Sequence, residues 1–372
     1  MTESPAKLCV VMASHMLENI GGAQLQSHHF SNYAQDNGWQ TYYLCRHDKP
    51  LSQQSYEIIS LGTRSRVFKG TFFEDALGLF KHLKRLRPTT IYQRGLKSHT
   101  GLCALYCMFN RRCKLVFHLA NEKDVNGERT RIVLKDLVKP QQIIEKALSY
   151  LGLRCANVVV AQTHAQDQLM RRLIKRSADL VVNNVFVPSV SATDRASSNK
   201  FRVLWVSNLK EQKRPEVVLD LAELLAGDSS VEIEMIGRPY GNPKSREEFE
   251  SRLESCENVS FLGEKTPAEV EHHMANADVF LSTSRIEGYP NTFVQAFSYG
   301  LPVISFEVDI DSIITKHKLG KVCNSVSELA EAIRVESQED TDTLKKTKRI
   351  KDFAKQQFGL DNFSPLLNLM LT

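Results

Sequence analysis

The fold of this chain is decided by the stretch SRIEGYPNTFVQAFSYGLPVIS, residues 284–305. A short apolar run, residues 279–282, comes before it and enters a loop that contains Gly and Pro. Residues 291–299 are predicted to form a helix, because they begin with Asn-Thr, two good N-cap types, and are followed by Gly300, a common helix stop. A second apolar run, residues 302–306, follows the helix. This order of strand, helix and strand predicts a parallel βαβ unit.

The same alternation extends outward from this stretch in both directions. The strand-like runs are mostly continuous in Val, Ile and Leu, which is typical of strands that helices cover on both faces of a parallel sheet. The predicted strands are residues 8–13, 40–45, 90–93, 114–119, 158–162, 180–183, 201–206, 231–236, 259–262, 278–282 and 302–306. The predicted helices include residues 23–37, 74–86, 166–175, 216–225, 267–275 and 291–299.

The 372 residues suffice for two domains of ordinary size. We predict a doubly wound N-terminal domain over residues 1–187 and a second one over residues 201–355. The Ser/Ala-rich stretch 188–200 is the predicted linker, and residues 356–372 form a tail that returns to the N-terminal domain. The expected fold class is therefore α/β, with two Rossmann-like domains facing each other across a cleft. Open α/β sheets bind ligands beyond the carboxyl ends of their strands.

The composition excludes several classes of protein. With 42% hydrophobic and 24% charged residues, the chain does not resemble collagen-like, disordered or disulfide-framework proteins. The eight cysteines include no C-x-x-C pair, which argues against a zinc ribbon, and reduced thiols are expected in the cytoplasm. The apolar runs, such as residues 101–109, are about half of the ~18 residues that a membrane span needs. No signal peptide is predicted.

The net charge of +5 is unevenly distributed along the chain. Residues 1–195 hold 27 Lys and Arg against 15 Asp and Glu, a net charge of +12. Residues 196–372 hold 21 against 28, a net charge of −7. This asymmetry predicts that the first half of the chain meets an anionic partner.

The loop before residue 291 has the properties of an anion site. It brings Glu287 and backbone N–H groups to a helix N-terminus, where anionic groups bind readily. Glu287 is expected to accept hydrogen bonds from sugar hydroxyls, and Gln295 lies one turn into the helix, within reach of a ribose. The alternative is an ordinary strand–loop–helix crossover with a Glu on the surface.

Three further places carry candidate side chains. Lys213 lies between a predicted strand and a predicted helix and is expected to meet a diphosphate as a point charge; otherwise it is a solvated loop lysine. Gly21 and Gly22 open a helix after the first strand, where backbone approaches a ligand closely, although two such glycines are also common caps. In the first half, His118 ends one predicted strand and Arg94 follows another. His118 is either a sugar contact or a structural imidazole.

At these residues the chain resembles a known family. The stretch EGYPNTFVQAFSYGLPVIS is similar to the donor-site signature of the retaining GT-B glycosyltransferases of family 4, the glycosyl transferases group 1 domain. In that signature a second Glu, which bonds the ribose, stands where this chain has Gln295. The stretch LWVSNLKEQKRPEVVLDLAELL, residues 204–225, resembles another family segment. Lys213 occupies the position of the diphosphate-binding lysine there, and Asn208 stands in place of an Arg.

The resemblance implies a hexosyltransferase that moves a sugar from a nucleoside diphosphate sugar to a saccharide or polyprenyl-diphosphate-linked acceptor, with retention, in surface polysaccharide or lipopolysaccharide synthesis. It implies no metal and no cofactor. The residues expected in catalysis are His118, Lys213 and Glu287. Those expected to bind the donor are Gly21, Gly22, Asn208, Gly237, Arg238, Gly288, Tyr289, Asn291, Thr292 and Gln295, and those expected to bind the acceptor are Arg94, Glu122 and Asp124.

Two other functions stay open on the same fold: a sugar-nucleotide epimerase and a catalytically silent nucleotide-sugar-binding subunit. The basic runs 81–87, 129–139 and 171–176 are either solvated helix surfaces or a contact with an anionic membrane. The expected location is the cytoplasm, with peripheral contact at the inner face of the cell membrane. Nucleic acid is not an expected partner, since the basic helices carry no aromatic stacking platform and no recognition motif.

Overall fold

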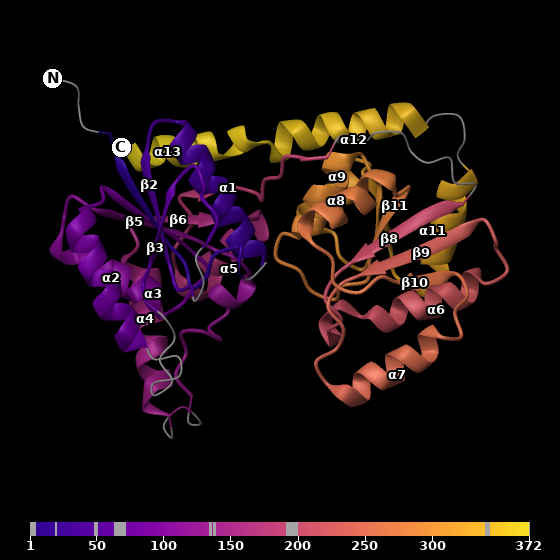
Figure 1. Cartoon of the computed structure of the whole chain (residues 1–372), viewed down its shortest axis with the longest axis horizontal. Coiled ribbons are helices and arrows are strands. Elements are labelled where there is room, and N and C mark those ends of the chain that lie inside the picture. The colour runs from indigo at the N-terminus through magenta and orange to yellow at the C-terminus, as the bar shows by residue number, and fades with distance from the viewer. Residues whose placement is uncertain are drawn as a thin grey trace. The chain divides into compact units, whose positions relative to one another are not determined.

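The computed structural model describes residues 5–18, 21–47, 51–62, 72–133, 136, 139–190, 200–338 and 343–371. The chain divides into two compact units (Figure 1). Unit 1 comprises Met1–Val185 and Leu360–Thr372, and unit 2 comprises Phe186–Gly359. The division falls shortly before the predicted linker 188–200, of which residues 191–199 lie outside the described residues.

Unit 1 is built on a parallel sheet of seven strands in the order β3-β2-β1-β4-β5-β6-β7. In this order the chain first moves outward to one edge and then to the other, which is doubly wound topology. Arg94 and His118 are register partners at the carboxyl ends of β4 and β5. The strands are β1 (Lys7–Val11), β2 (Gln40–Cys45), β3 (Glu57–Ser60), β4 (Thr90–Arg94), β5 (Lys114–His118), β6 (Val158–Ala161) and β7 (Leu180–Val181).

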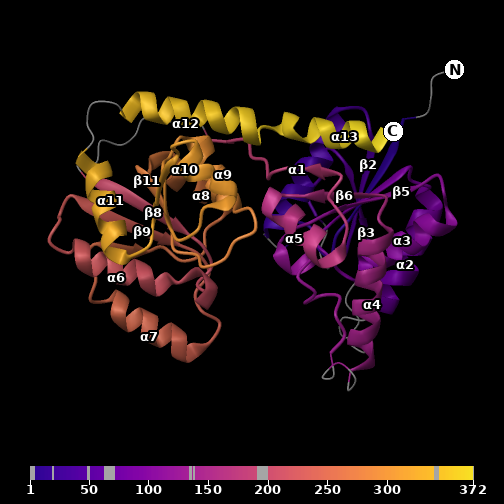
Figure 2. The ribbon, with the colours of Figure 1, turned by 180° about the vertical axis from the view of Figure 1, so that it is seen from behind.

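Helices cover both faces of this sheet, as the continuous apolar strands require. One core joins the strands to α2, α3, α4 and α5, and the other joins them to α1 and the C-terminal helix α13 (Figures 1 and 2). Phe363 packs its ring 5.1 Å from that of Phe30, so the end of the chain belongs to this core. The elements are α1 (Gly22–Asp36), α2 (Phe72–Leu86), α3 (Ser98–Phe109), η1 (Glu122–Asp124), α4 (Pro140–Cys155), α5 (His164–Ile174), η5 (Leu360–Phe363) and α13 (Ser364–Leu371).

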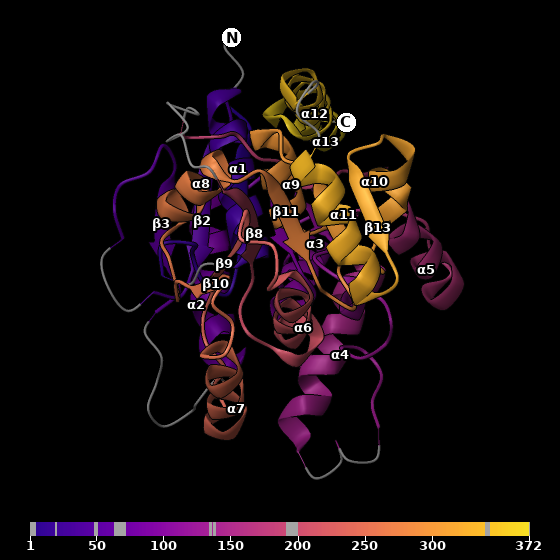
Figure 3. The same cartoon turned by 90° about the vertical axis from the view of Figure 1, so that its right-hand side faces the viewer.

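Unit 2 repeats the plan with six parallel strands in the order β10-β9-β8-β11-β12-β13. Its core on one face includes α6, α7 and α11, and its core on the other includes α8, α9, α10 and α12 (Figures 1 and 3). The strands are β8 (Phe201–Val206), β9 (Val231–Ile236), β10 (Val259–Phe261), β11 (Val279–Ser282), β12 (Val303–Phe306) and β13 (Gly320–Cys323). The helices are η3 (Glu211–Lys213), α6 (Pro215–Leu225), α7 (Pro243–Leu253), α8 (Pro267–Asn276), α9 (Asn291–Tyr299), η4 (Ile310–Ser312), α10 (Ile313–Lys316), α11 (Val326–Gln338) and α12 (Thr343–Phe358).

The structure confirms the predicted α/β class, with two Rossmann-like units and parallel sheets. Strands β3 and β13 were missing from the prediction; both lie at a sheet edge, where only part of the strand is buried and the apolar pattern is weak. All eight cysteines are free thiols, and Cys155 alone among them is exposed. Among the described residues, no helix is long and apolar enough to cross a membrane.

Candidate functional site

The segment 284–305 forms the predicted strand, loop, helix and strand in unit 2. The loop after β11 leads into α9, which begins at Asn291 and ends at Gly300 in the left-handed conformation (φ 81°). The N-cap is Pro290 rather than the expected Asn291 or Thr292, and it brings no side-chain hydrogen bond to the helix start. The N-cap residue therefore leaves the first N–H groups of α9 to other partners, and such a helix start is suited to an anionic ligand.

Two residues predicted for catalysis meet at this edge of the sheet. Lys213, at the end of η3, forms an ion pair with Glu287 in the β11–α9 loop. The two side chains are 23% and 15% exposed, so the pair is largely buried but still accessible to solvent. Lys213 and Glu287 are 74 residues apart in the sequence, and the fold brings this cation and this carboxylate together next to a helix N-terminus.

Hydrogen bonds hold the loops that carry Lys213 and Glu287 together. The Thr283 hydroxyl donates to the Lys213 carbonyl at 2.7 Å and accepts from the Trp205 indole N–H at 2.9 Å. The Arg285 N–H donates to the Gln212 carbonyl at 2.9 Å. Because Trp205 belongs to β8 and lies in the core, the position of Lys213 is fixed relative to the strand.

Arg214 is a positioning residue that the sequence did not single out. It is 7% exposed and takes the left-handed conformation (φ 47°) as the N-cap of α6. Its guanidinium donates to the Thr283 carbonyl at 2.7 Å, pairs with Glu307 at 2.8 Å and lies 4.3 Å from the centre of the Phe306 ring. These bonds join the loops that follow β8, β11 and β12. The only signal in the sequence is an Arg directly before a helix that starts with Pro.

The loops after β8 and β9 supply the next group of predicted donor residues. The Asn208 side chain accepts from the Arg238 N–H at 3.2 Å, and the exposed Arg238 side chain pairs with Glu264 at 2.7 Å. Gly237 has φ 156°, and a Cβ there would lie 1.7 Å from the Ser207 carbonyl oxygen. Only glycine allows these two loops to approach so closely.

The remaining donor-site predictions lie on or beside α9. Gly288 is partly exposed, as are Asn291 and Thr292 in the first turn, and Gln295 is half-buried one turn further along. Tyr289 is 7% exposed and packs its ring 5.8 Å from that of Phe358 in α12. Burial raises the pKa of Tyr289 well above its usual value. The structure thus places the Tyr289 ring in the core, while its role toward a donor stays a prediction.

In unit 1, His118 lies at the end of β5 in a fully buried polar cluster. Its Nδ1 is 2.8 Å from the Tyr92 hydroxyl and 3.3 Å from the Arg94 guanidinium. Because a guanidinium can only donate, Nδ1 is the acceptor and the proton of the neutral ring is on Nε2. Burial, helped by the Arg94 charge, holds the pKa of His118 well below its usual value. His118 is therefore a neutral imidazole with a fixed tautomer.

Arg94 is 2% exposed and has polar partners without negative charge. It donates to the Asn184 side chain at 2.5 Å and lies 3.5 Å from the Tyr92 hydroxyl. No carboxylate of the described residues forms an ion pair with it. A buried cation without a counter-charge is costly unless a ligand supplies one, which keeps Arg94 a candidate for an anionic acceptor group.

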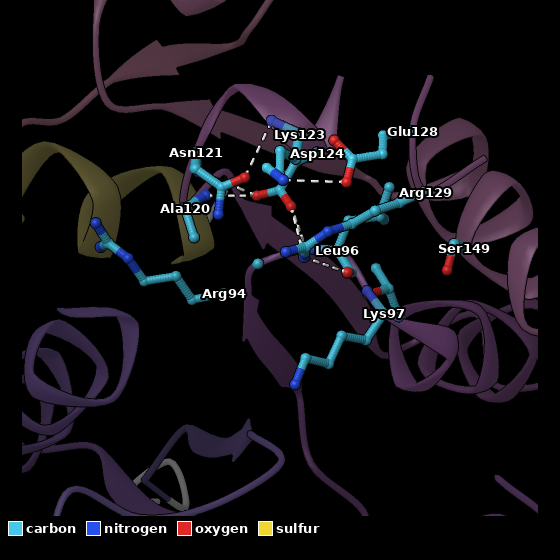
Figure 4. A network of polar contacts seen from close by, with 12 residues as sticks. Arg94, Leu96, Lys97, Ala120, Asn121, Lys123, Asp124, Glu128, Arg129 and Ser149 are labelled. Carbon is cyan, nitrogen blue, oxygen red and sulfur yellow. Dashed lines mark hydrogen bonds and ion pairs between the residues drawn. The ribbon is translucent and has the colours of Figure 1, made fainter. Parts of the chain in front are cut away.

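Asp124 is bound within the protein, as Figure 4 shows. Its carboxylate, 1% exposed, accepts from the backbone N–H groups of Leu96 (3.0 Å) and Ala120 (2.7 Å) and pairs with Arg129 at 2.9 Å. Burial raises the pKa of Asp124, and Arg129 and the backbone donors oppose that rise. Asp124 thus joins the loops after β4 and β5, and Arg94 points away from it (Figure 4). Glu122, at the start of the same short helix η1, is exposed.

The carboxyl edge of unit 1 carries a second cluster that the sequence analysis missed. His15, just after β1, and His28 of α1 each lie 2.7 Å from the Tyr56 hydroxyl. Burial lowers the pKa of His15 to about 4, and burial also lowers that of His28. The predicted pair Gly21 and Gly22 begins α1 beside this cluster, with Gly21 as the N-cap. Tyr56 lies 41 and 28 residues from the two histidines, and no motif joins the three residues.

The comparisons with known proteins agree with this geometry. Residues 200–335 match the family described as "Glycosyl transferases group 1". That range contains every donor-site residue predicted in unit 2. These findings support a glycosyltransferase. The chain is also 26% identical over 262 residues to the O-antigen biosynthesis glycosyltransferase WbnH of Escherichia coli, which covers 66% of this chain and 69% of that protein.

Solved structures resemble the chain over nearly its whole length. Anabaena Alr3699/HepE in complex with UDP-glucose superposes with a TM-score of 0.75 at 17% identity, covering 98% of this chain and 99% of that one. WaaG, a glycosyltransferase involved in lipopolysaccharide biosynthesis, superposes with a TM-score of 0.71 at 14% identity, covering 98% and 99%. Two parallel-sheet Rossmann-like units are the architecture of GT-B glycosyltransferase structures, and this chain has that architecture.

Proposed function

We propose that this chain is a family 4 retaining hexosyltransferase of polysaccharide biosynthesis that uses a nucleoside diphosphate sugar. The observation that carries the proposal is the Lys213–Glu287 pair beside the N-terminus of α9, inside the range that matches the glycosyltransferase family. A departing diphosphate carries negative charge that must be stabilised as the sugar leaves. A lysine and a helix N-terminus, both held in place before the donor arrives, supply that stabilisation.

In the proposed reaction, the Lys213 ammonium and the α9 N-terminus bind the diphosphate. Glu287 holds Lys213 before the donor binds and accepts from donor hydroxyls afterwards. Gln295 bonds the ribose as a neutral partner. No residue is proposed as a glycosyl nucleophile; the leaving phosphate helps to deprotonate the acceptor on the same face of the sugar. The proposal needs neither a metal nor a cofactor.

The acceptor, a saccharide or a lipid-linked saccharide, is assigned to unit 1. Arg94 offers a cation without a carboxylate partner among the described residues, and His118 is a neutral donor beside it. The relatives act in O-antigen and lipopolysaccharide biosynthesis, which supports an acceptor of this kind. The proposed location is the cytoplasm, at the inner face of the membrane where such acceptors are carried.

The test is a panel of nucleoside diphosphate sugars assayed for release of the nucleoside diphosphate, with and without lipid-linked saccharide acceptors. Two results together would support a retaining transferase. The nucleoside diphosphate should be released only when acceptor is present, and NMR of the anomeric proton should show that the sugar keeps the axial configuration of the donor in the product. An isomerised nucleotide sugar without acceptor would indicate the epimerase. Tight nucleotide binding without any turnover would indicate a silent binding subunit, and either result would overturn the proposal.

A further inference from the structure

The amino-terminal edge of the unit 1 sheet carries a hollow of about 740 Å³. It lies where α2 and α3 end, and its lining includes Thr89 and Cys113, which directly precede β4 and β5. Arg94 and His118 end those same two strands. The hollow is therefore at the opposite edge of the sheet from the proposed acceptor residues.

The lining combines cations with aromatic rings. Lys84, Arg87 and Arg112 are exposed side chains around it, and Phe80, Tyr106 and Phe109 form its apolar part. The described lining holds no carboxylate. None of the three cations forms an ion pair with a carboxylate of the described residues, whereas many exposed cations of unit 2 are paired, for example Arg238 with Glu264.

Large apolar side chains project beside these cations. Phe109 is 85% exposed and Met108 is 56% exposed, although the rest of α3 is mostly buried. Arg111 and Arg112 follow them after Asn110 and are exposed as well. Single exposed apolar residues are ordinary, but an exposed Phe-Met pair next to a basic, aromatic-lined hollow forms one amphipathic surface.

This surface is held on a firm support. The Tyr106 hydroxyl donates to the Leu83 carbonyl at 3.0 Å, which joins α3 to the last turn of α2. The Asn110 side chain donates to the Tyr106 carbonyl at 2.9 Å and closes α3, while Arg87 takes the left-handed conformation (φ 49°) and closes α2. The cations and rings are therefore presented by two fixed helix ends.

The stability of the two helix ends explains only part of the composition of this surface. Lys84 and Arg85 lie in the last turn of α2, where cations stabilise the helix dipole. That account does not explain why Phe109 and Met108 are exposed, or why the hollow beside them is lined with aromatic rings. If these helix ends needed only cations for stability, no large apolar side chains would have to project from them.

We propose that this basic-aromatic surface docks unit 1 on an anionic phospholipid membrane. Lipid phosphates meet Lys84, Arg87 and Arg112, and Phe109 with Met108 enters the boundary between headgroups and acyl chains. Basic residues attract anionic leaflets, and exposed Phe and other apolar side chains suit that boundary. The inference does not rest on the proposed reaction, since the surface lies at the other edge of the sheet.

The test uses the full chain and vesicles of phosphatidylcholine, either pure or with about one-third phosphatidylglycerol. We expect co-sedimentation with the anionic vesicles at low salt and release at 1 M salt, where the Debye length falls to ~3 Å. Replacing Lys84, Arg87 and Arg112 together by Gln should weaken the apparent partition constant at least about tenfold. The matched control replaces three exposed unit 2 lysines, Lys316, Lys321 and Lys348, by Gln, and should bind as the unchanged chain does.

A second readout follows insertion directly. Phe109→Trp places an indole at the proposed contact, while Trp39 and Trp205 are 4% and 2% exposed and should respond little. Its emission should shift to the blue on anionic vesicles and stay unchanged on neutral ones. Equal binding to both vesicles, an equal loss in the control triple variant, or an unshifted indole would overturn the proposal. The proposal would also be overturned if the triple variant lost binding to RNA while it kept its binding to vesicles.

Discussion

The carboxyl edges of the two sheets are built in opposite ways. In unit 2, a cation and a carboxylate, Lys213 and Glu287, remain partly exposed beside a helix N-terminus. In unit 1, two charged groups at the corresponding edge are buried: Arg94 is 2% exposed and Asp124 is 1% exposed. The same topology therefore yields one edge with an accessible ion pair and one edge where Asp124 is buried and paired with Arg129, while Arg94 is buried without a carboxylate partner among the described residues.

This difference separates two kinds of role. A charge that is fixed by backbone contacts but open to solvent is ready for a ligand, because little reorganisation is needed when the ligand binds. A buried charge that is paired and hydrogen-bonded, as Asp124 is, mainly holds loops together, and its loss is felt first as a loss of stability. Variants at the two edges should therefore fail in different assays.

The largest effect is expected at Lys213. Lys213→Ala should lower turnover at least ~100-fold with little change in melting temperature, because a contact to the departing diphosphate is lost. The matched control is Lys210→Ala, an exposed lysine of the same loop, which should keep near-normal turnover. Steady-state release of nucleoside diphosphate measures both. Equal losses in the two variants would show only a general electrostatic effect.

Asp124→Asn should act on stability instead. The new amide group would face N–H donors from Leu96, Ala120 and Arg129, and we expect a loss of about 2 kcal/mol, which is a fall of roughly 4–8 °C in the unit 1 transition. Glu128→Gln, which removes only the exposed pair with Lys123, should change stability by less than about 0.5 kcal/mol. Calorimetry measures both. A higher KM for the acceptor at unchanged stability would instead place Asp124 in acceptor binding.

Unit 1 should also be the more acid-sensitive unit. The pKa of His15 is lowered to about 4 in the folded state, against about 6.5 when the chain is unfolded. As the pH falls below 6.5, the unfolded state takes up the proton first, so stability is lost between pH 6.5 and about 4. After allowance for solvent screening, we expect a loss of about 1 kcal/mol at pH 5 from His15.

The matched variants are His15→Gln and His272→Gln. His272 is an exposed histidine of unit 2. Melting curves at pH 7 and pH 5 should show a smaller acid shift in the first variant and an unchanged shift in the second. An acid shift that His15→Gln leaves unaltered would assign the sensitivity to other groups, such as His118.

The smallest effect is expected at Gln295, where one neutral side chain is proposed to meet the ribose. Gln295→Glu should bind nucleoside diphosphate as well as the unchanged chain or up to a few-fold more tightly. Gln295→Leu should bind it more weakly, by about tenfold, since one or two hydrogen bonds are lost. Isothermal titration measures the dissociation constants. An unchanged constant in Gln295→Leu would exclude contact with the ribose.

Local patterns in the sequence were enough to predict most of the fold. The strands over residues 40–45, 201–206 and 231–236 and the helix over residues 291–299 have the predicted bounds, because burial on both faces and a glycine stop leave a strong local signal. The edge strand β3 left no such signal. The expected positions of Lys213 and Glu287 at strand-to-helix loops also followed from local order and family resemblance.

The partners of these side chains were decided only by the tertiary structure. Nothing in the sequence indicates that Arg214 bonds the loops after β11 and β12, because its partners are 69 and 93 residues away. Asp124 has near partners in Ala120 and Arg129, but its bond to Leu96, 28 residues away, is what places it between two loops. The same holds for His118, whose tautomer depends on Arg94 across the strand pair. Sequence order fixes which loops reach the carboxyl edge, since all strands of a sheet run in parallel. Burial and packing decide which of their charges remain open to a ligand.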